Sequence, residues 1–140
     1  MNKGLAMPPS RVSVIVSIYK DIETLDLILE ALTGQTAGGF EIVVSEDGED
    51  PQVKRYLEQY PVPCVHVSGP DIGWTKNRAL NRAVCAASGD YLIFIDGDCI
   101  PHSRFVANHL ALAEARTAVS GRRVDIGPLY AKRLRSRRLR

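Results

Sequence analysis

Short apolar runs alternate along the chain with longer stretches in which apolar and polar residues repeat at helical spacing. The apolar runs occupy residues 12–18, 40–44, 64–67, 91–95 and 118–124. Most of them carry Val and Ile at successive positions rather than at every second position. Runs of this kind are typical of strands that helices bury on both faces. A mainly parallel sheet built from these five strands is therefore predicted.

The stretches between the runs predict four helices. Each contains apolar residues at spacings of three and four, the pattern of a helix with one buried face. The four stripes are Leu25, Ile28, Leu29 and Leu32; Val53, Tyr56, Leu57 and Tyr60; Leu80, Ala83, Val84 and Ala87; and Phe105, Val106, His109, Leu110 and Ala113. Strands that alternate with helices indicate an α/β fold. We assign residues 11–126 to this domain, 1–10 to an N-terminal extension, and 127–140 to a basic tail that begins a further helix.

The composition fits one globular domain and narrows its class. The chain has 140 residues, and its net charge of +2 is unevenly spread, because residues 132–140 hold six basic residues and no acid. The rest is mildly acidic, which argues against a nucleic-acid interface. Three cysteines without a CxxC pair argue against a disulfide framework or a structural zinc site. With no apolar run long enough to span a membrane and no signal peptide, we expect a cytoplasmic protein whose cysteines are small buried residues.

Acidic residues gather where the predicted strands end, which is the ligand-binding edge of an open α/β sheet. Asp96-Gly97-Asp98 follows the most apolar strand, and acids two positions apart on an extended chain point the same way. Two carboxylates combined with phosphate oxygens are a common donor set for Mg²⁺ or Mn²⁺. The motif therefore predicts a metal-bridged diphosphate site, with a simple Asp-Gly turn as the alternative. His102 is a further candidate ligand, with a turn after Ile100 and Pro101 as its alternative explanation.

Two other segments at the same edge are candidates for nucleotide contacts. Glu46-Asp47-Gly48 ends the second strand, where a carboxylate can accept hydrogen bonds from a ribose hydroxyl or a base N–H. A tight turn is the alternative. Lys76 and Arg78 fall in the first turn of the third helix, where cations oppose the helix dipole and would suit an anion; solvated surface charge is the alternative. Trp74 is interpreted either as a stacking residue or as part of the core.

Four blocks of sequence carry a family resemblance. They are VSVIVSIYKDIETLDLILEALTGQT, FEIVVSEDGED, DIGWTKNRALNRAVCAASGDYLIFIDGDCIPHSRFVANHL and AVSGRRV. Together they resemble the nucleotide-sugar-binding portion of family 2 glycosyltransferases, which have the Rossmann-like GT-A fold. The second block is similar to the family's EIIVVDDGS block, with Glu46 in place of the first Asp and Glu49 in place of the Ser. The third block is the most specific, because several features occur in it at fixed spacing.

The resemblance implies roles for individual residues. It implies contacts with the donor nucleotide for Ser17, Tyr19, Glu46, Asp47, Gly73, Lys76, Arg78, Asp96 and Gly97. It also implies that Asp98, together with Asp96, binds Mn²⁺ or Mg²⁺. The implied reaction is transfer of a hexosyl or hexosaminyl unit from a UDP-sugar to an acceptor hydroxyl, with inversion. The metal would stabilise the charge that grows on the leaving UDP.

The chain departs from the family after the DxD motif. Family members continue well past this strand, so the chain is interpreted as a GT-A domain truncated at its C-terminus. No general base is assigned, because Glu114 is expected on an outer helix and Asp125 follows too soon. A non-catalytic nucleotide- or metal-binding module is therefore the alternative. An incomplete domain would expose an apolar edge that favours self-association. The basic tail is a candidate for peripheral contact with anionic lipid, with a solvated helix as the simpler interpretation.

Overall fold

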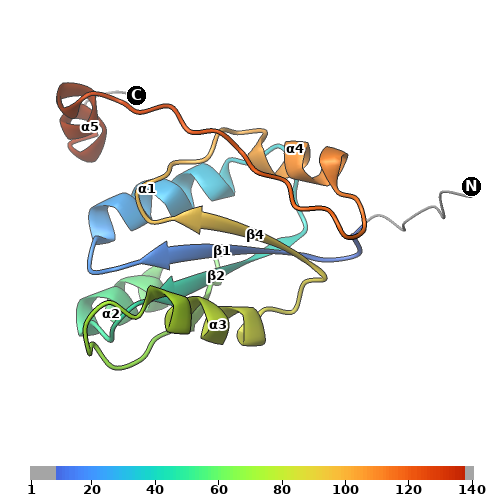
Figure 1. Ribbon diagram of the computed structural model, residues 1–140. Helices are drawn as coiled ribbons and strands as arrows, with labels where there is room; N and C mark the ends of the chain where they lie inside the picture. The colour runs from blue at the N-terminus through green and yellow to red at the C-terminus, as the bar shows by residue number, and fades with distance from the viewer. Residues whose placement is uncertain (1–8, 138–140) are drawn as a thin grey trace, which may run out of the picture.

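The computed structural model describes residues 9–137 and contains one parallel sheet flanked by helices. The elements in chain order are β1 (Val12–Ile18), α1 (Ile22–Thr33), β2 (Phe40–Glu46), α2 (Pro51–Gln59), β3 (Val65–Val67), α3 (Lys76–Ala86), β4 (Tyr91–Asp96), α4 (Phe105–Leu112) and α5 (Pro128–Arg135). The strand order is β3-β2-β1-β4, and every pairing is parallel. Figure 1 shows α1 and α4 on one side of the sheet and α3 on the other. The predicted α/β architecture is confirmed.

The core occupies both faces of the sheet, as the continuous apolar runs predict. All seven residues of β1 are buried. On one face, Val14 and Val16 of β1 pack in a cluster with the apolar stripe of α1, which contains Leu25, Ile28, Leu29 and Leu32. On the other face, Ile15 and Val43 pack against Ala83 of α3. Burial on both faces fixes the register of the central strands, because a slip of one residue would exchange the two faces.

Local signals in the sequence explain where the helices begin and end. Asp21 caps α1, since its carboxylate accepts a hydrogen bond from the Thr24 N–H at 3.1 Å. Gly34 follows the last residue of α1 and caps its end, where its N–H donates to the Glu30 carbonyl at 3.1 Å. Pro51 occupies the first turn of α2, where its missing N–H costs no helical hydrogen bond. All four helices predicted from the apolar stripes are confirmed as α1 to α4.

The prediction of a fifth strand at 118–124 is wrong. This segment is irregular and mostly exposed, and β4 forms the edge of the sheet. The adjacent apolar residues Ala118 and Val119 are followed by Ser120-Gly121-Arg122-Arg123, which leaves no apolar face to bury against a helix. Glu114 also departs from expectation, because α4 ends at Leu112 and leaves this residue beyond the helix.

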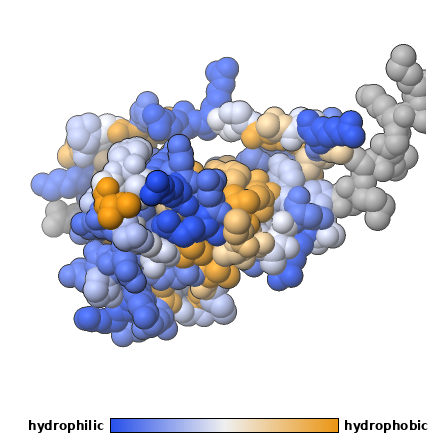
Figure 2. Space-filling view, turned by 60° about the horizontal axis from the view of Figure 1, so that its bottom comes forward, coloured by the Kyte–Doolittle hydropathy of each residue, from blue (hydrophilic) through white to orange (hydrophobic). Residues whose placement is uncertain are grey.

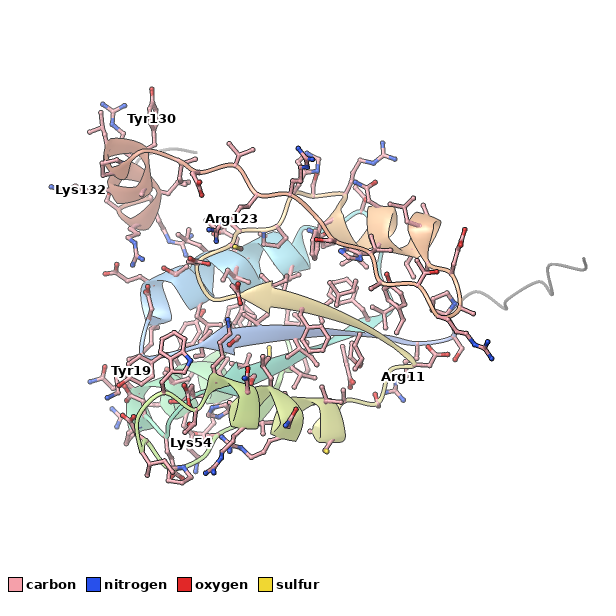
Figure 3. The ribbon with its side chains drawn as sticks, viewed as in Figure 1. Arg11, Tyr19, Lys54, Arg123, Tyr130 and Lys132 are labelled. Carbon is pink, nitrogen blue, oxygen red and sulfur yellow. The ribbon has the colours of Figure 1, made fainter. Side chains whose placement is uncertain are left out.

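The basic tail forms the expected helix, α5, within the described residues. Arg135 pairs with Asp21 at the start of α1, with its Nη2 2.8 Å from Oδ2. Arg137 pairs with Asp26 and Glu30 on the same helix. Arg138, Arg140 and most of the N-terminal extension lie outside the described residues. Figure 3 shows Lys132 and Tyr130 on α5, away from the sheet.

The cysteines are less buried than predicted. Cys85 is exposed, whereas Cys64 and Cys99 are half-buried. Burial raises the pKa of the Cys64 thiol to about 11, which keeps it protonated and unreactive at neutral pH. The expectation of small buried residues therefore fails for Cys85, which lies on the solvent side of α3.

The side of the sheet that carries α3 leaves β4 partly uncovered. Helix α3 packs on β1, β2 and β3, and Phe94 of β4 is 53% exposed. The space-filling view of this side shows an apolar band between hydrophilic areas (Figure 2). The polar ends of the strands therefore lie next to an open apolar surface.

Candidate functional site

Three strands bring polar residues into one row at the carboxyl edge of the sheet. In the parallel register, Ser17 of β1 lies opposite Ser45 of β2 and Asp96 of β4. Paired residues of parallel strands point to the same face, so this row faces the side that carries α3. Ser17 and Ser45 are buried, whereas Asp96 is exposed. The row thus leads from the interior to solvent at the end of β4.

The DxD segment is a tight turn whose glycine is required by packing. A Cβ atom on Gly97 would lie 2.4 Å from the carbonyl oxygen of Ser17, so no larger residue fits there. The Cys99 N–H donates to the Asp96 carbonyl at 3.0 Å and closes the turn. Asp98 is exposed and accepts a hydrogen bond from the Cys99 thiol at 3.3 Å. The turn therefore holds two carboxylates at the surface, directly beside β1.

A lysine from another element meets this turn. Lys76 begins α3, and its Nζ lies 2.5 Å from Oδ1 of Asp96. Both side chains are partly open to solvent, with 33% of Lys76 and 55% of Asp96 exposed. Arg78, two residues further along α3, is exposed. The structure thus brings Lys76 to the predicted metal site.

Asp47 is buried where the sheet meets the start of α3. Its two carboxylate oxygens accept hydrogen bonds from Thr75, one from the N–H at 3.1 Å and one from the hydroxyl at 2.5 Å. The Thr75 side chain consequently does not cap α3. Thr75 was not predicted to be part of the site, although a threonine just before a helix is a common capping signal. Asp47 therefore connects the end of β2 to the segment that carries Lys76.

Glu46 is 1% exposed, and both of its carboxylate oxygens are bonded inside the protein. Oε2 lies 2.7 Å from Nε2 of His66, and Oε1 accepts the Asp50 N–H at 2.7 Å. His66 lies on β3, an edge strand of the sheet, and from there it is the partner of this carboxylate. A buried carboxylate needs such partners to offset its lost hydration.

Tyr19, Lys20 and Asp71 form a cluster across the loops after β1 and β3. The Lys20 ammonium lies 2.8 Å from the Asp71 carboxylate and 4.9 Å from the centre of the Tyr19 ring. The hydrogen bond with Lys20 lowers the pKa of Asp71. Gly48 lies beneath them with a positive φ of 141°, and a Cβ there would meet Asp71 and Tyr19. Figure 3 places Tyr19 at the carboxyl end of the sheet, opposite Arg11.

The segment before α3 is exposed. Gly73 has a φ of 97°, a backbone conformation that other residues rarely adopt. Trp74 is 90% exposed, so of the two interpretations left open for it, the core position is excluded. An indole ring in solvent beside Thr75 and Lys76 is available to contact a ligand.

The carboxylates at the edge suit a hard divalent cation, but they supply only part of its ligands. Among residues 9–137, no group of three or more His, Cys, Asp or Glu side chains is arranged to hold a metal ion. His102 does not complete such a group, and its Nδ1 accepts the Arg104 N–H at 3.2 Å. Asp96 and Asp98 together with diphosphate oxygens and water would satisfy Mg²⁺ or Mn²⁺, which commonly bind through one or two carboxylates and substrate phosphates.

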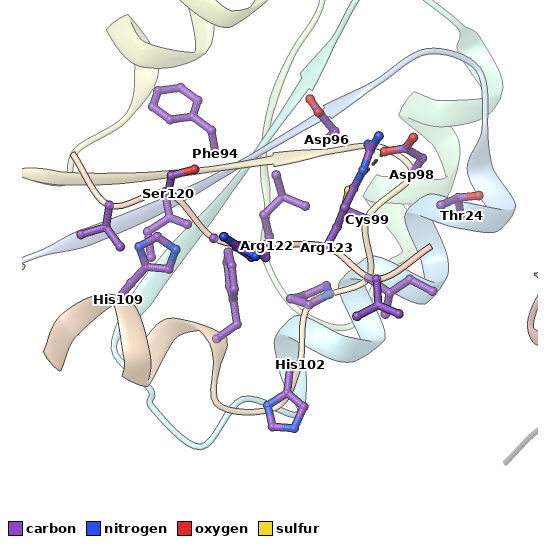
Figure 4. A pocket seen from close by; sticks show the side chains of 18 of the residues that line it. Thr24, Phe94, Asp96, Asp98, Cys99, His102, His109, Ser120, Arg122 and Arg123 are labelled. Atoms are coloured by element: carbon purple, nitrogen blue, oxygen red, sulfur yellow. Dashed lines mark hydrogen bonds between the residues drawn. The ribbon is translucent and has the colours of Figure 1, made fainter. Parts of the chain in front are cut away.

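A cavity of about 1130 Å³ extends from these carboxylates along β4. Asp96 and Asp98 line it together with Arg122, Arg123 and His109. In Figure 4, the Arg123 side chain points toward Asp98 and Cys99. Nearby carboxylates, Asp125 foremost, raise the pKa of Arg123. No role was predicted for Arg123, because the residue was expected to lie inside a strand.

Comparisons with other proteins show the family to which this chain belongs. The sequence model of glycosyl transferase family 2 matches residues 13–139. The chain belongs to this family. Among curated relatives, glycosyltransferase AglE of Haloferax volcanii is 29% identical over 119 residues, which are 82% of this chain and 37% of that protein. The cholesterol galactosyltransferase of Borreliella burgdorferi is 29% identical over 91 residues, which are 63% of this chain and 25% of that protein.

Solved glycosyltransferase structures share the fold. The mannosyltransferase PcManGT from Pyrobaculum calidifontis, in complex with GDP-Man and Mn²⁺, matches with a TM-score of 0.64 and 26% identity over 79% of this chain and 34% of that one. TarS of S. aureus in complex with UDP matches with a TM-score of 0.56 and 23% identity, over 72% of this chain and 31% of that one. This family 2 chain therefore has the GT-A fold. It spans about two fifths or less of the length of the curated relatives that it matches.

No helix within residues 9–137 of this family 2 chain is long and apolar enough to cross a membrane.

Proposed function

We propose that this chain is the donor-binding portion of an inverting, metal-dependent glycosyltransferase. It binds a UDP-sugar, and the sugar, a hexosyl or hexosaminyl unit, passes to an acceptor hydroxyl. The observation that carries the proposal is the meeting of Lys76 with Asp96 at the carboxyl end of β4, one residue from Asp98. A cation and two carboxylates at one edge are what a metal-bound diphosphate requires, because the anion needs positive charge and the metal needs oxygen ligands.

The roles follow the elements that carry the residues. Asp98 and Asp96 would hold Mn²⁺ or Mg²⁺, which would supply positive charge for the diphosphate. Lys76 and Arg78 stand in the first turn of α3, where unpaired N–H groups already favour an anion. Ser17, Asp47 and Tyr19 border the base and ribose. At Gly73 and Gly97, the lack of a side chain lets the backbone approach the nucleotide. The complex of the mannosyltransferase relative with GDP-Man and Mn²⁺ supports a divalent metal.

The metal, when bound, neutralises the charge that develops on the departing diphosphate. Lys76 orients the phosphates and exchanges its contact with Asp96 for one with a phosphate oxygen. Asp47 holds the Thr75 segment in place, so that the first turn of α3 faces the diphosphate. A general base must also remove the proton of the acceptor hydroxyl. Within residues 9–137, Asp125 is 91% exposed and paired with Arg123, so we assign it no such role.

A second candidate function is binding of the nucleotide and metal without transfer. The observation that favours it is the absence of an assigned base in the described part of the chain. Cytoplasmic location, self-association and peripheral membrane contact through the basic tail remain predictions.

Calorimetry and a turnover assay test the two candidates. The protein is titrated with UDP, GDP and TDP, each with and without Mn²⁺, and is then incubated with UDP-sugars and acceptors. The proposal expects UDP binding that requires Mn²⁺, followed by release of UDP from the sugar donor. Metal-dependent binding without transfer or donor hydrolysis would favour the second candidate. Absence of binding for all three nucleotides would contradict both.

A further inference from the structure

The buried pair formed by Glu46 and His66 lies next to the proposed donor site without facing it. Glu46 is the last residue of β2, and its neighbour Asp47 is a proposed nucleobase contact. The side chain of Glu46 is 2% exposed, and that of His66 is 18% exposed. A ligand at the edge of the sheet cannot replace these internal partners without opening the turn. Glu46 therefore needs a role other than direct contact.

The bonds of Glu46 connect three elements. Through Oε2 it reaches His66 on β3, and through Oε1 it holds the Asp50 N–H at the start of α2, each at 2.7 Å. Asp50 in turn caps α2 by accepting the Gln52 N–H at 2.8 Å. Glu46 thus closes the turn 46–50 from the inside and ties it to the edge strand.

The same turn determines where Asp47 points. The Asp47 N–H donates to the Ile18 carbonyl at 3.0 Å, and the Gly48 carbonyl accepts the Gly69 N–H at 3.0 Å. With its backbone held in this way, Asp47 directs both oxygens at Thr75. A network in which every member has a partner is rigid, and loss of one member releases the others.

We propose that Glu46 and His66 are positioning residues that hold Asp47 and, through Thr75, the first turn of α3 in the orientation that binds the donor nucleotide. The Glu46 side chain is long enough to reach β3, where its Oε2 lies 2.7 Å from Nε2 of His66. The inference rests on the proposed function, because it concerns the geometry of the donor site.

The variants test whether the contacts that the Glu46 side chain reaches are needed, rather than its negative charge. Glu46→Gln keeps an oxygen for the Asp50 N–H and places an amide against His66, so it preserves both contacts. Glu46→Ala removes both. His66→Gln retains a polar group on β3, whereas His66→Ala does not. Glu58→Ala is the matched control, because it removes an exposed acid from α2.

Calorimetry with UDP and Mn²⁺ on the full chain measures the effect. Glu46→Ala is expected to weaken UDP binding about tenfold, or about 1.4 kcal/mol. Glu46→Gln and Glu58→Ala are expected to bind like the wild type. In a protein that already carries Asp47→Ala, Glu46→Ala is expected to cause no further loss of UDP affinity, because the side chain that Glu46 positions has been removed. Additive losses, or a Glu46→Ala variant that binds like the wild type, would overturn the inference.

Amide hydrogen exchange separates this inference from the proposed function and does not require the ligand. Folding of each variant is first checked by circular dichroism. In folded Glu46→Ala, the Thr75 amide should exchange faster by about tenfold, because its acceptor Asp47 is no longer held. In Glu46→Gln it should exchange at the wild-type rate. Unchanged Thr75 exchange in Glu46→Ala would overturn the positioning role even if UDP binds. Failure of the wild type to bind any nucleotide would overturn the proposed function and the donor-site role of the pair, whatever the exchange result.

If Glu46→Ala does not fold, His66→Ala provides the same comparison from the other partner, with His66→Gln as its rescue. Weakened UDP binding and faster Thr75 exchange in His66→Ala, both restored in His66→Gln, would support the inference. Unchanged UDP binding and exchange in His66→Ala would overturn it.

Discussion

Replacing Lys76 with Met separates two effects that most substitutions at a metal site combine. In the absence of ligand, the Lys76 ammonium lies 2.5 Å from Oδ1 of Asp96 and competes there with a metal cation. In the proposed donor complex, the same ammonium would attract the diphosphate. Lys76→Met keeps the length and the apolar stem of the side chain but removes the charge. We therefore expect it to strengthen binding of Mn²⁺ alone and to weaken binding of UDP in the presence of Mn²⁺.

The sizes of the two effects follow from exposure. An exposed ion pair contributes about 0.2–1 kcal/mol, and 55% of the Asp96 side chain is exposed. Removing the competing ammonium should thus tighten Mn²⁺ binding by roughly fivefold at most. A charged hydrogen bond to a phosphate is worth about 1.5–3 kcal/mol, so its loss should weaken UDP binding by roughly tenfold or more.

Both quantities can be measured on one preparation. Manganese affinity is obtained from the electron paramagnetic resonance signal of unbound Mn²⁺, and UDP affinity from calorimetry at saturating Mn²⁺. Lys54→Met is the matched control, since Lys54 lies exposed on α2. The reasoning is refuted if Lys76→Met leaves UDP affinity unchanged, or if it weakens Mn²⁺ binding, because Lys76 would then neither attract the diphosphate nor compete with the metal.

Three further predictions concern the metal ligand, the core and the tail. Asp98→Asn is expected to weaken Mn²⁺-dependent UDP binding by about tenfold or more, or about 1.4 kcal/mol, while binding measured by calorimetry without metal stays the same. An unchanged affinity with Mn²⁺ would reject Asp98 as a ligand. Ile28→Ala removes a side chain that is 0% exposed and should lower the free energy of unfolding in urea by about 2–5 kcal/mol. Leu112→Ala, at a site that is 60% exposed, is the control and should change it by about 0.5 kcal/mol or less. The hydrogen bond with Arg135 lowers the pKa of Asp21 from its usual 3.8. That pairing therefore stabilises the fold above this value and is lost as the pH falls through the lowered pKa. Urea unfolding between about pH 6 and about pH 3 should show a smaller loss of stability in Arg135→Gln than in the wild type; equal losses would contradict the coupling.

Much of the fold could be predicted because the sequence signals it locally. Burial on both faces of β1 and β2 is visible in their adjacent Val and Ile residues, and the stripe of Leu25, Ile28 and Leu29 marks the buried face of α1. The strand predicted at 118–124 failed because its assignment depended on spacing and on resemblance. Its own residues include Ser120 and Gly121, which provide no apolar face.

The candidate site was predicted in its position but not in its contacts. The end of a parallel strand identifies Asp96 and Asp98, and the start of a helix identifies Lys76. That Lys76 contacts Asp96 depends on how α3 crosses the sheet, which no local pattern specifies. The partners Thr75 and His66 were missed for the same reason, because each meets its carboxylate from a different element. Long-range polar contacts of this kind leave no periodic signal in the sequence.

The most direct test of the central claim is a crystal of this protein soaked with MnCl₂ and UDP, with diffraction data collected near the manganese absorption edge. The account predicts an anomalous peak within coordination distance of the Asp98 carboxylate, close to Asp96, with the diphosphate of UDP on its other side. A manganese peak elsewhere, or UDP bound away from this edge with Asp96 and Asp98 turned from it, would contradict the account.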